Sequence, residues 1–297
     1  MSQLKLLIKT EYLTEIKSKS FWLGTILIPI VVIGFGVFAG FMMSDEVAKA
    51  VSPTTPEPGE MTDAQAAGML VGLFLALFLI AYGSSIYQKV RKEKVNRIME
   101  VLATCVTGRM MMISKIISVA LIGLTQIAIW FVLIMGAAIT AVIVFSPDIP
   151  WEIFRNPKIY VAGIWSLLFF VGGYVFYGSI YAACGAMTDK DNENQTYMTV
   201  LTFLLLGSFY VEQFAATHPT NAFVTVCSFI PFTAPAIGAV NAVSGMVPLW
   251  QSLLSLGVLF VFAWLAVNIS GKIYTSSILL KGRKFTLSDI WLFMKMK

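Results

Sequence analysis

The sequence has few charged residues for its length. Only 12% of its 297 residues are Asp, Glu, Lys or Arg, whereas 58% are hydrophobic. Soluble domains carry about 25% charged residues, so the composition excludes a water-soluble protein and predicts an integral membrane protein. The net charge of +5 does not indicate nucleic-acid binding, because the basic residues cluster beside long hydrophobic runs, as in the cytoplasmic loops of membrane proteins.

Residues that carry chemistry are also scarce. The chain has one histidine, His218, and three cysteines, Cys105, Cys184 and Cys227, none with the spacing of a metal site. It has no Gly-x-x-x-x-Gly-Lys-Ser/Thr loop for nucleotide phosphates and no His-Glu-x-x-His or Ser-His-Asp set. We therefore expect no catalytic residue, no metal, no cofactor bound by this chain and no disulfide, with the cysteines as small packing residues.

Long apolar runs dominate what is present. A transmembrane helix requires about 20 predominantly apolar residues, and six runs meet that length. These predicted spans cover 20–43, 65–87, 116–145, 159–187, 196–214 and 249–270. The predicted fold class is therefore an all-α integral membrane protein with six transmembrane helices, in a single transmembrane domain over 1–297.

Residues 1–19 mix apolar with charged side chains. This pattern is typical of an amphipathic helix that lies on the membrane surface. A signal peptide is the rival interpretation, but its apolar region has about 7–15 residues, fewer than the run that follows here, and no small-residue cleavage site stands out. We expect a surface helix that leads into an uncleaved first span.

The region between the last two spans, 215–247, has a different pattern. Two apolar pieces, 221–230 and 234–243, are separated by Pro231-Phe-Thr-Ala-Pro235. Each piece has about 10 residues, which is too short to cross a bilayer. The pattern predicts a re-entrant pair of half-helices, whose irregular backbone must be covered by protein or face water.

Basic residues predict the orientation. With the N-terminus inside, only three of the 21 lysines and arginines, Lys49, Arg155 and Lys158, fall in outer segments. The positive-inside rule therefore places both termini in the cytoplasm and the re-entrant region outside. The cytoplasmic segments would be the 1–19 helix, the 88–115 region, the 188–195 turn and the 271–297 tail. We expect a multi-pass protein of the plasma membrane, specifically the bacterial inner membrane.

The most charged segment follows the second predicted span. Four apolar residues from Val95 to Leu102 recur at the spacing of an amphipathic helix, and Glu93 and Arg97 are spaced for a helical ion pair. The pattern predicts a helix over 93–104 that lies on the membrane surface or docks into a partner.

Charges within the predicted spans are scarce. Glu212 lies near the outer end of the fifth span. It is a candidate contact for a substrate or ion, although an interfacial carboxylate at a helix end is the simpler interpretation. Without paired buried acids, a proton-coupled or sodium-coupled carrier has no evident relay, and an intramembrane enzyme lacks its catalytic groups.

Several segments, in this order, resemble one family. Glu93-Lys-Val-Asn-Arg-Ile-Met-Glu-Val-Leu102, followed by Lys115-Ile-Ile, resembles the coupling-helix region of type-2 ABC exporter permeases. Phe229-Ile-Pro-Phe-Thr-Ala-Pro235 resembles that family's phenylalanine-and-proline motif between the last two spans. The turn Asp189-Lys-Asp-Asn-Glu-Asn-Gln195 also fits its place in the family. Within this family, the chain is most similar to the sodium-efflux-like (Nat-type) permeases.

The resemblance implies a half-transporter. Two permease copies, identical or related, would pair in the bilayer, and each would contact a separate ATP-binding-cassette subunit that binds ATP and magnesium. The residues implied in coupling to that ATPase are Glu93, Lys94, Arg97, Glu100, Leu102, Asp189, Asp191 and Glu193. The residues implied in an extracytoplasmic gate are Phe229, Pro231, Phe232 and Pro235.

Other functions stay open at this stage. One alternative is a membrane assembly or structural subunit that uses the same fold without moving a solute, and another is an enzyme or a secondary carrier. The substrate is open too, because apolar spans suit lipids or amphipathic drugs as well as the bilayer. Nat-type permeases often carry a large domain between the first two spans, whereas residues 44–64 form only a short acidic loop.

Overall fold

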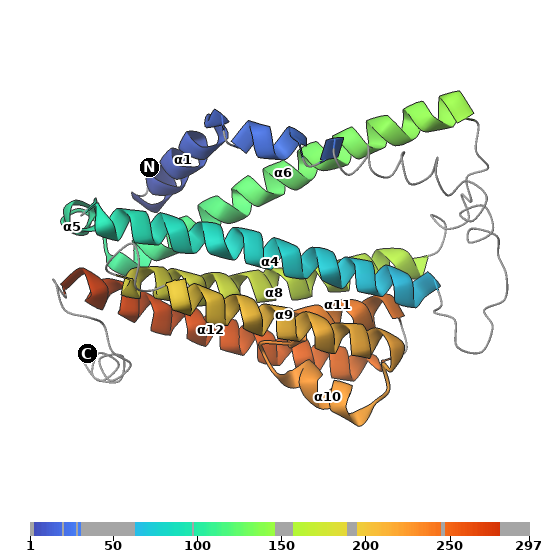
Figure 1. The fold of residues 1–297 in the computed structure, drawn as a ribbon. Helices are drawn as coiled ribbons and strands as arrows, with labels where there is room; N and C mark the ends of the chain where they lie inside the picture. Colours follow the sequence, from blue (N-terminus) through green and yellow to red (C-terminus); the bar gives the residue numbers. More distant parts are fainter. Residues whose placement is uncertain are drawn as a thin grey trace.

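The computed structural model describes residues 3–19, 21–27, 29–30, 63–96, 98–145, 157–188, 195–244 and 247–279. Within these ranges every regular element is helical (Figure 1). The helices are α1 (Gln3–Ile16), α4 (Asp63–Val95), α5 (Ile98–Ala103), α6 (Gly108–Phe145), α8 (Pro157–Met187), α9 (Gln195–Thr217), α10 (Ala222–Phe229), α11 (Ala234–Ser244) and α12 (Leu249–Leu279).

Five helices are long and apolar enough to cross a membrane. These candidate spans are Gly72–Val95, Gly108–Leu133, Tyr160–Met187, Tyr197–Thr217 and Leu249–Ser277, in α4, α6, α8, α9 and α12. They correspond to five of the six predicted spans, so the prediction of an all-helical, multi-pass membrane protein is confirmed. The predicted first span, 20–43, lies largely outside the described residues, although residues 21–27 are helical.

The helices continue beyond the predicted spans. α4 extends to Val95 rather than ending at 87, and α6 begins at Gly108 rather than at 116. Apolar length predicts where a helix crosses lipid, whereas helix ends also depend on protein contacts. Val90 is completely buried, and Met111 and Met112 are almost completely so, which stabilises these extra turns.

The predicted continuous helix over 93–104 is wrong. α4 ends at Val95, the chain turns at Asn96, and the short helix α5 follows. Asn is unfavourable inside helices because its side chain competes for backbone hydrogen bonds. Met99 of α5 is buried in the core, and this contact holds α5 in place after the turn.

α8 lies at the centre of the bundle and packs against α4, α11 and α12 (Figure 1). Glycines let these neighbours approach closely. A methyl group on Gly173 would lie 2.6 Å from a side-chain carbon of Pro235, and one on Gly185 would lie 2.7 Å from the Tyr87 carbonyl oxygen. Between these glycines, Tyr177 and Tyr181 are among the largest fully buried side chains.

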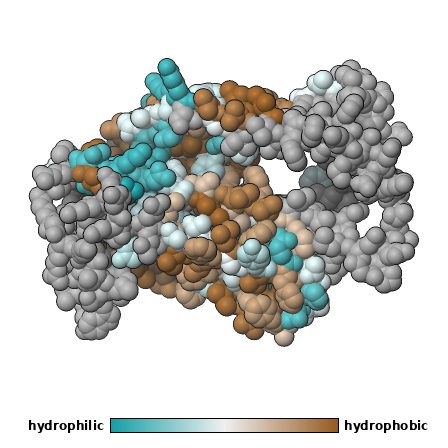
Figure 2. Space-filling model, viewed as in Figure 1, coloured by the Kyte–Doolittle hydropathy of each residue, from teal (hydrophilic) through white to brown (hydrophobic). Residues whose placement is uncertain are grey.

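Figure 1 shows that α5 and α10 lie at opposite ends of the bundle, which we name the α5 end and the α10 end. α1 packs along α6. In Figure 2, hydrophilic residues gather over the region of α1 and the end of α4, whereas the middle of the visible face is mainly hydrophobic. This distribution suits a protein whose middle lies in a bilayer.

The two short helices α10 and α11 correspond to the apolar pieces 221–230 and 234–243 of the sequence. α10 begins after Asn221, whose side chain accepts a hydrogen bond from the Phe223 N–H at 2.8 Å and so caps the helix. A turn leads to α11, which packs against α4, α8 and α9. Whether this pair dips into the bilayer stays a prediction.

Candidate functional site

A buried ion cluster lies at the α5 end. The Lys115 side chain is only 1% exposed, and its Nζ lies 3.0 Å from Oε1 of Glu11 and 2.5 Å from Oε1 of Glu93. The three residues come from α6, α1 and α4. A buried ammonium group is costly without counter-charges, and the two carboxylates supply them. The cluster therefore joins three helices that are distant in sequence.

Two serines of α6 complete the attachment of Glu11. Ser118 Oγ donates a hydrogen bond to Oε2 of Glu11 at 2.7 Å, and Ser114 Oγ lies 3.5 Å from Oε1. Ser114 and Ser118 are four residues apart, so they project from the same face of α6. One carboxylate of α1 thus faces three polar side chains of α6, those of Ser114, Lys115 and Ser118.

The cluster carries one more negative than positive charge. Oε2 of Glu93 and the hydroxyl of Tyr274 in α12 are buried and have no hydrogen-bond partner among the described residues. The two groups are close enough to interact electrostatically. This surplus acceptor lies beside α12, so the cluster is not a closed, fully satisfied network.

α1 depends on polar contacts for its position. None of its residues is buried. Besides Glu11, Glu15 lies 3.0 Å from Lys89 Nζ on α4, and the Tyr12 hydroxyl lies 2.8 Å from Thr125 Oγ1 on α6. The Lys89–Glu15 pair is partly exposed and contributes at most about 1 kcal/mol. The Lys115 cluster is therefore the main polar attachment of α1.

The end of α8 is fixed to the last turns of α4. Lys94 Nζ donates to the Ala186 carbonyl oxygen at 2.6 Å, where the exposed carbonyls of a helix C-terminus favour a cation. The hydroxyls of Tyr87 and Thr188 lie 3.2 Å apart. The predicted 188–195 turn therefore starts beside the charged end of α4.

The predicted coupling residues are placed as follows. Glu93 binds Lys115, and Lys94 binds the end of α8. Leu102 is half-buried against the core. Glu100 lies in α5, but its side chain is outside the described residues, as are Arg97, Asp189, Asp191 and Glu193. The proposed Glu93–Arg97 pair is therefore not described, and the Glu93 carboxylate is directed towards α6.

Sequence reasoning missed Lys115, Glu11 and Ser118 as a site. Lys115 was assigned to a cytoplasmic loop, and Glu11 to a helix that rests on lipid. The available signal was the spacing of Ser114, Lys115 and Ser118, which places three polar residues on one side of an otherwise apolar run. A lysine in such a run needs a buried counter-charge, but the sequence does not say which acid supplies it.

The predicted gate residues lie in and beside the turn between α10 and α11, which contacts the middle of α8 and α9. The Phe232 carbonyl oxygen accepts hydrogen bonds from the Tyr177 hydroxyl at 2.6 Å and from Ser208 Oγ at 3.1 Å. Its ring packs edge-on against Phe176, with ring centres 5.1 Å apart. Pro235 is packed against Gly173, and Phe229 and Pro231 are half-buried. The turn is thereby held to both α8 and α9.

Glu212 is not the solvated interfacial carboxylate that the simpler interpretation predicts. Its side chain is 0% exposed within the chain, and neither carboxylate oxygen has a hydrogen-bond partner among the described residues. It faces Gly72 of α4, where a methyl group would lie 1.8 Å from Oε1 of Glu212. The missing side chain at Gly72 makes the space that the carboxyl group fills.

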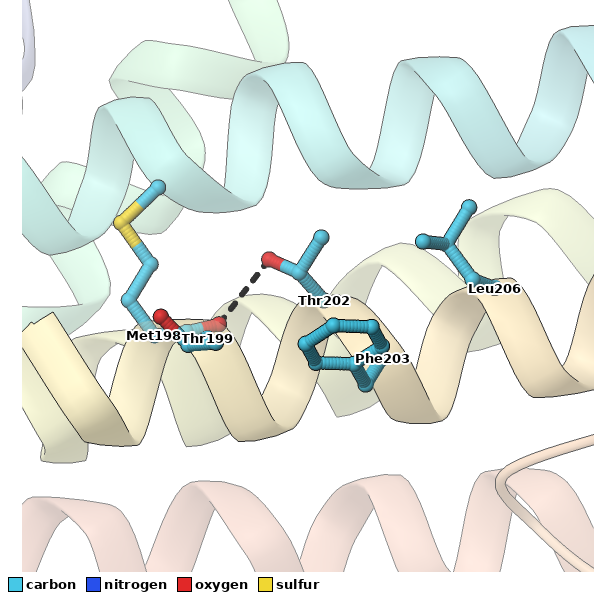
Figure 3. Close-up of a pocket in the computed structure, with 5 residues that line it drawn as sticks. All are labelled: Met198, Thr199, Thr202, Phe203 and Leu206. Atoms are coloured by element: carbon cyan, nitrogen blue, oxygen red, sulfur yellow. Dashed lines mark hydrogen bonds between the residues drawn. The ribbon is translucent and has the colours of Figure 1, made fainter.

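A shallow hollow of about 140 Å³ lies on α9. Its lining residues are Met198, Thr199, Thr202, Phe203 and Leu206 (Figure 3). Met198, Thr202 and Leu206 point towards α4, and Thr202 Oγ1 donates to the Met198 carbonyl oxygen at 2.9 Å. No ionisable side chain lines the hollow, so it offers an apolar surface rather than a catalytic centre.

Within the described part of the chain, no group of three or more His, Cys, Asp or Glu side chains could hold a metal ion. The three cysteines are free.

Two curated proteins are similar to this chain in sequence. The uncharacterised protein YhaP of Bacillus subtilis is 27% identical over 234 residues, which are 75% of this chain and 55% of YhaP. The uncharacterised protein MJ1024 of Methanocaldococcus jannaschii is 24% identical over 222 residues, which are 74% of this chain and 52% of MJ1024. The chain thus spans about half the length of these relatives. No solved structure matches it.

The sequence profile of ABC-2 family transporter proteins matches residues 42–272. This range contains α4 to α11 and most of α12, together with Glu93, Lys115 and the turn around Phe232. Because the match covers most of the chain, the protein belongs to the ABC-2 family of membrane transporter proteins.

Proposed function

We propose that the protein is the permease subunit of an ABC exporter. It forms the translocation path and is driven by a separate ATP-binding-cassette subunit, which binds ATP and magnesium. The observation that carries the proposal is the Lys115 cluster, because it joins the end of α4, which would receive the ATPase, to α1 and α6.

The geometry supports mechanical coupling through α5. α5 packs against α4 and α12, and buried Met99 anchors it to the core. α4 is one continuous helix of 33 residues, about 50 Å long, that connects α5 with the Gly72–Glu212 contact. Pressure on α5 would therefore move α4 as a rod, and the Lys115 cluster would make α1 and α6 follow.

The proposed coupling surface is the α5 end. It comprises Glu93, Lys94, the Arg97–Leu102 segment and the turn with Asp189, Asp191 and Glu193. Lys94 connects the two parts, since it binds the last turn of α8. The gate, formed by Phe229, Pro231, Phe232 and Pro235, lies at the turn between α10 and α11. Opening it would break the hydrogen bonds to the Phe232 carbonyl oxygen.

A second permease copy would complete the path. Large apolar side chains at Val200, Phe203, Leu206 and Tyr210 form an exposed stripe along α9. The stripe suits lipid or a second copy, identical or related. The orientation that we propose places both termini and the α5 end in the cytoplasm, with 20–43 as the sixth span and α10–α11 as a re-entrant pair outside. The membrane would be the plasma membrane, in a bacterium the inner membrane.

A reconstitution with the cognate ATPase tests the proposal. The double variant Arg97→Ala/Glu100→Ala removes two polar groups of the coupling segment without touching a described buried contact. It should insert and fold normally but lose most of the permease-dependent stimulation of ATP hydrolysis. Lys92→Ala, an exposed residue of the last turns of α4, is the control and should keep that stimulation.

Two results would reject the proposal. Normal stimulation in the double variant would exclude coupling through this segment. A complex that hydrolyses ATP but is never stimulated by any solute would favour the alternative, a membrane assembly subunit. Candidate solutes added to the same assay would identify the substrate class, including sodium as in Nat-type permeases.

A further inference from the structure

Glu212 lies in a half of the bundle whose described helices carry very few charged side chains. α4 carries no Asp, Glu, Lys or Arg between Asp63 and Lys89, and α10 and α11 carry none at all. α8 has none after Lys158, and α12 has none before Lys272. On α4, α10, α11 and α12, Glu212 therefore has no counter-charge within its own half of the bundle, and the one lysine of α8 in that half, Lys158, lies in the first turn of the helix.

The neighbouring titratable groups do not supply a partner for the Glu212 carboxyl group either. Tyr210 and His218 are exposed, and the Tyr177 hydroxyl is bound to the Phe232 carbonyl. On α4 the nearest phenol, Tyr82, donates to Gln126 at 2.7 Å. On α10 the Cys227 thiol is buried in an apolar cluster with Ala215, Val224 and Ile237. α11 has no titratable side chain.

The contact with Gly72 limits what can neutralise the carboxyl group. A single added carbon on Gly72 would lie 1.8 Å from Oε1. On this side there is consequently no room for an ammonium group or a hydrated ion. An enclosed carboxylate with neither donor nor cation loses its hydration without compensation, and a proton is the one cation that needs no further space.

We propose that Glu212 is a proton-binding site that controls the α10 end of the transporter. With the proton bound, the neutral carboxyl group packs against Gly72 and holds α9 to α4. When the proton leaves, the carboxylate needs water, so α9 separates from α4 and the α10 end loosens. Protons would thereby bias the gate independently of the force applied at α5.

Cys227 is a native reporter of this movement. It is 6% exposed and packs in the cluster of Ala215 and Ile237, against which Val211 also packs. Val211 precedes Glu212 in α9, so separation of α9 from its neighbours should expose the thiol. Replacing Cys105 and Cys184 by serine leaves Cys227 as the single cysteine.

The experiment measures the rate at which a small methanethiosulfonate reagent labels Cys227 in this single-cysteine chain, reconstituted in lipid nanodiscs. Rates are compared with those of Glu212→Gln, from about pH 5 to about pH 8. The thiol's own ionisation affects both chains alike, so their rate ratio isolates Glu212. We expect the labelling rate with Glu212 present, divided by the rate in Glu212→Gln, to be near one at low pH. This ratio should rise on the order of tenfold at high pH, as for one ionising group.

His218→Gln is the matched control, because it replaces the one histidine of the chain, which lies exposed after α9. It should keep the pH dependence. If Glu212→Gln does not fold, Glu212→Met has a similar length without an ionisable group and should show the same loss. A rate ratio that is constant with pH, or a loss of the dependence in His218→Gln, would overturn the proposal. The measurement needs no ATPase, so its outcome is independent of the proposed coupling.

Discussion

At the scale of single residues, the informative positions are charges that the fold has buried. Lys115 is satisfied by Glu11 and Glu93 from two other helices. Glu212 has no described partner and is accommodated by a glycine. The first arrangement stabilises a junction, because each partner neutralises the other. The second leaves a group whose charge state depends on whether the surrounding helices stay together.

Lys115→Ala should destabilise the protein strongly. The substitution leaves two carboxylates facing each other without their cation, and breaking a buried ion pair costs about 3–5 kcal/mol. The thermal unfolding midpoint of the purified protein in detergent should fall clearly. Lys89→Ala removes the partly exposed pair with Glu15 and should cost at most about 1 kcal/mol. Equal midpoints for the two variants would show that the cluster contributes no more than a surface pair.

At the scale of helices, close packing around α8 determines the arrangement. Glycines at the contact positions let α4, α11 and α12 approach, and tyrosines between them fill the interior. α5 and α10 are too short to be stable alone, since isolated helices of fewer than about 12 residues are marginal in water. Their positions therefore depend on anchors such as Met99 and Cys227.

Gly185→Ala and Gly163→Ala should have different effects, although both change a glycine of α8. The new methyl group at 185 would lie 2.7 Å from the backbone oxygen of Tyr87, so α4 would have to move, at about 1–3 kcal/mol. At Gly163 no atom lies within 4 Å, and alanine should be neutral or stabilise the helix by up to about 1 kcal/mol. Thermal unfolding in detergent measures both. A stable Gly185→Ala variant would mean that the α4–α8 contact can relax.

At the scale of the whole molecule, the two ends of the bundle have different properties. The α5 end carries the ion cluster and the charged end of α4, whereas α10 and α11 carry no Asp, Glu, Lys or Arg. This asymmetry suits the proposed permease, in which an ATPase would act on one side and the solute would leave on the other.

Cysteine labelling tests the orientation. Cys105 is exposed between α5 and α6 and should react with a membrane-impermeant maleimide only from the cytoplasmic side. With Cys105, Cys184 and Cys227 replaced by serine, His218→Cys should react only from outside, because residue 218 is exposed at the α10 end. Labelling of both positions from the same side would contradict the proposed topology.

Much of the fold could be predicted from the sequence. Five candidate spans and the two short helices α10 and α11 correspond to predicted elements, because apolar length and proline punctuation are local properties. The interruption at Asn96 and the extension of α4 and α6 could not be predicted in this way. Helix ends there depend on burial of Val90, Met99 and Met111 by distant segments.

The sequence alone determined that this protein crosses a membrane as a set of helices, because a bilayer requires apolar segments whose backbone groups are satisfied internally. Only the tertiary structure decided which of the few charged side chains are buried and which partners they have. Lys115, assigned to a loop, became the centre of a buried junction, and Glu212, assigned to an interface, became an enclosed acid. The physical reason is that the free energy of a charge depends on its neighbours in space, and these come from helices that are distant in the chain.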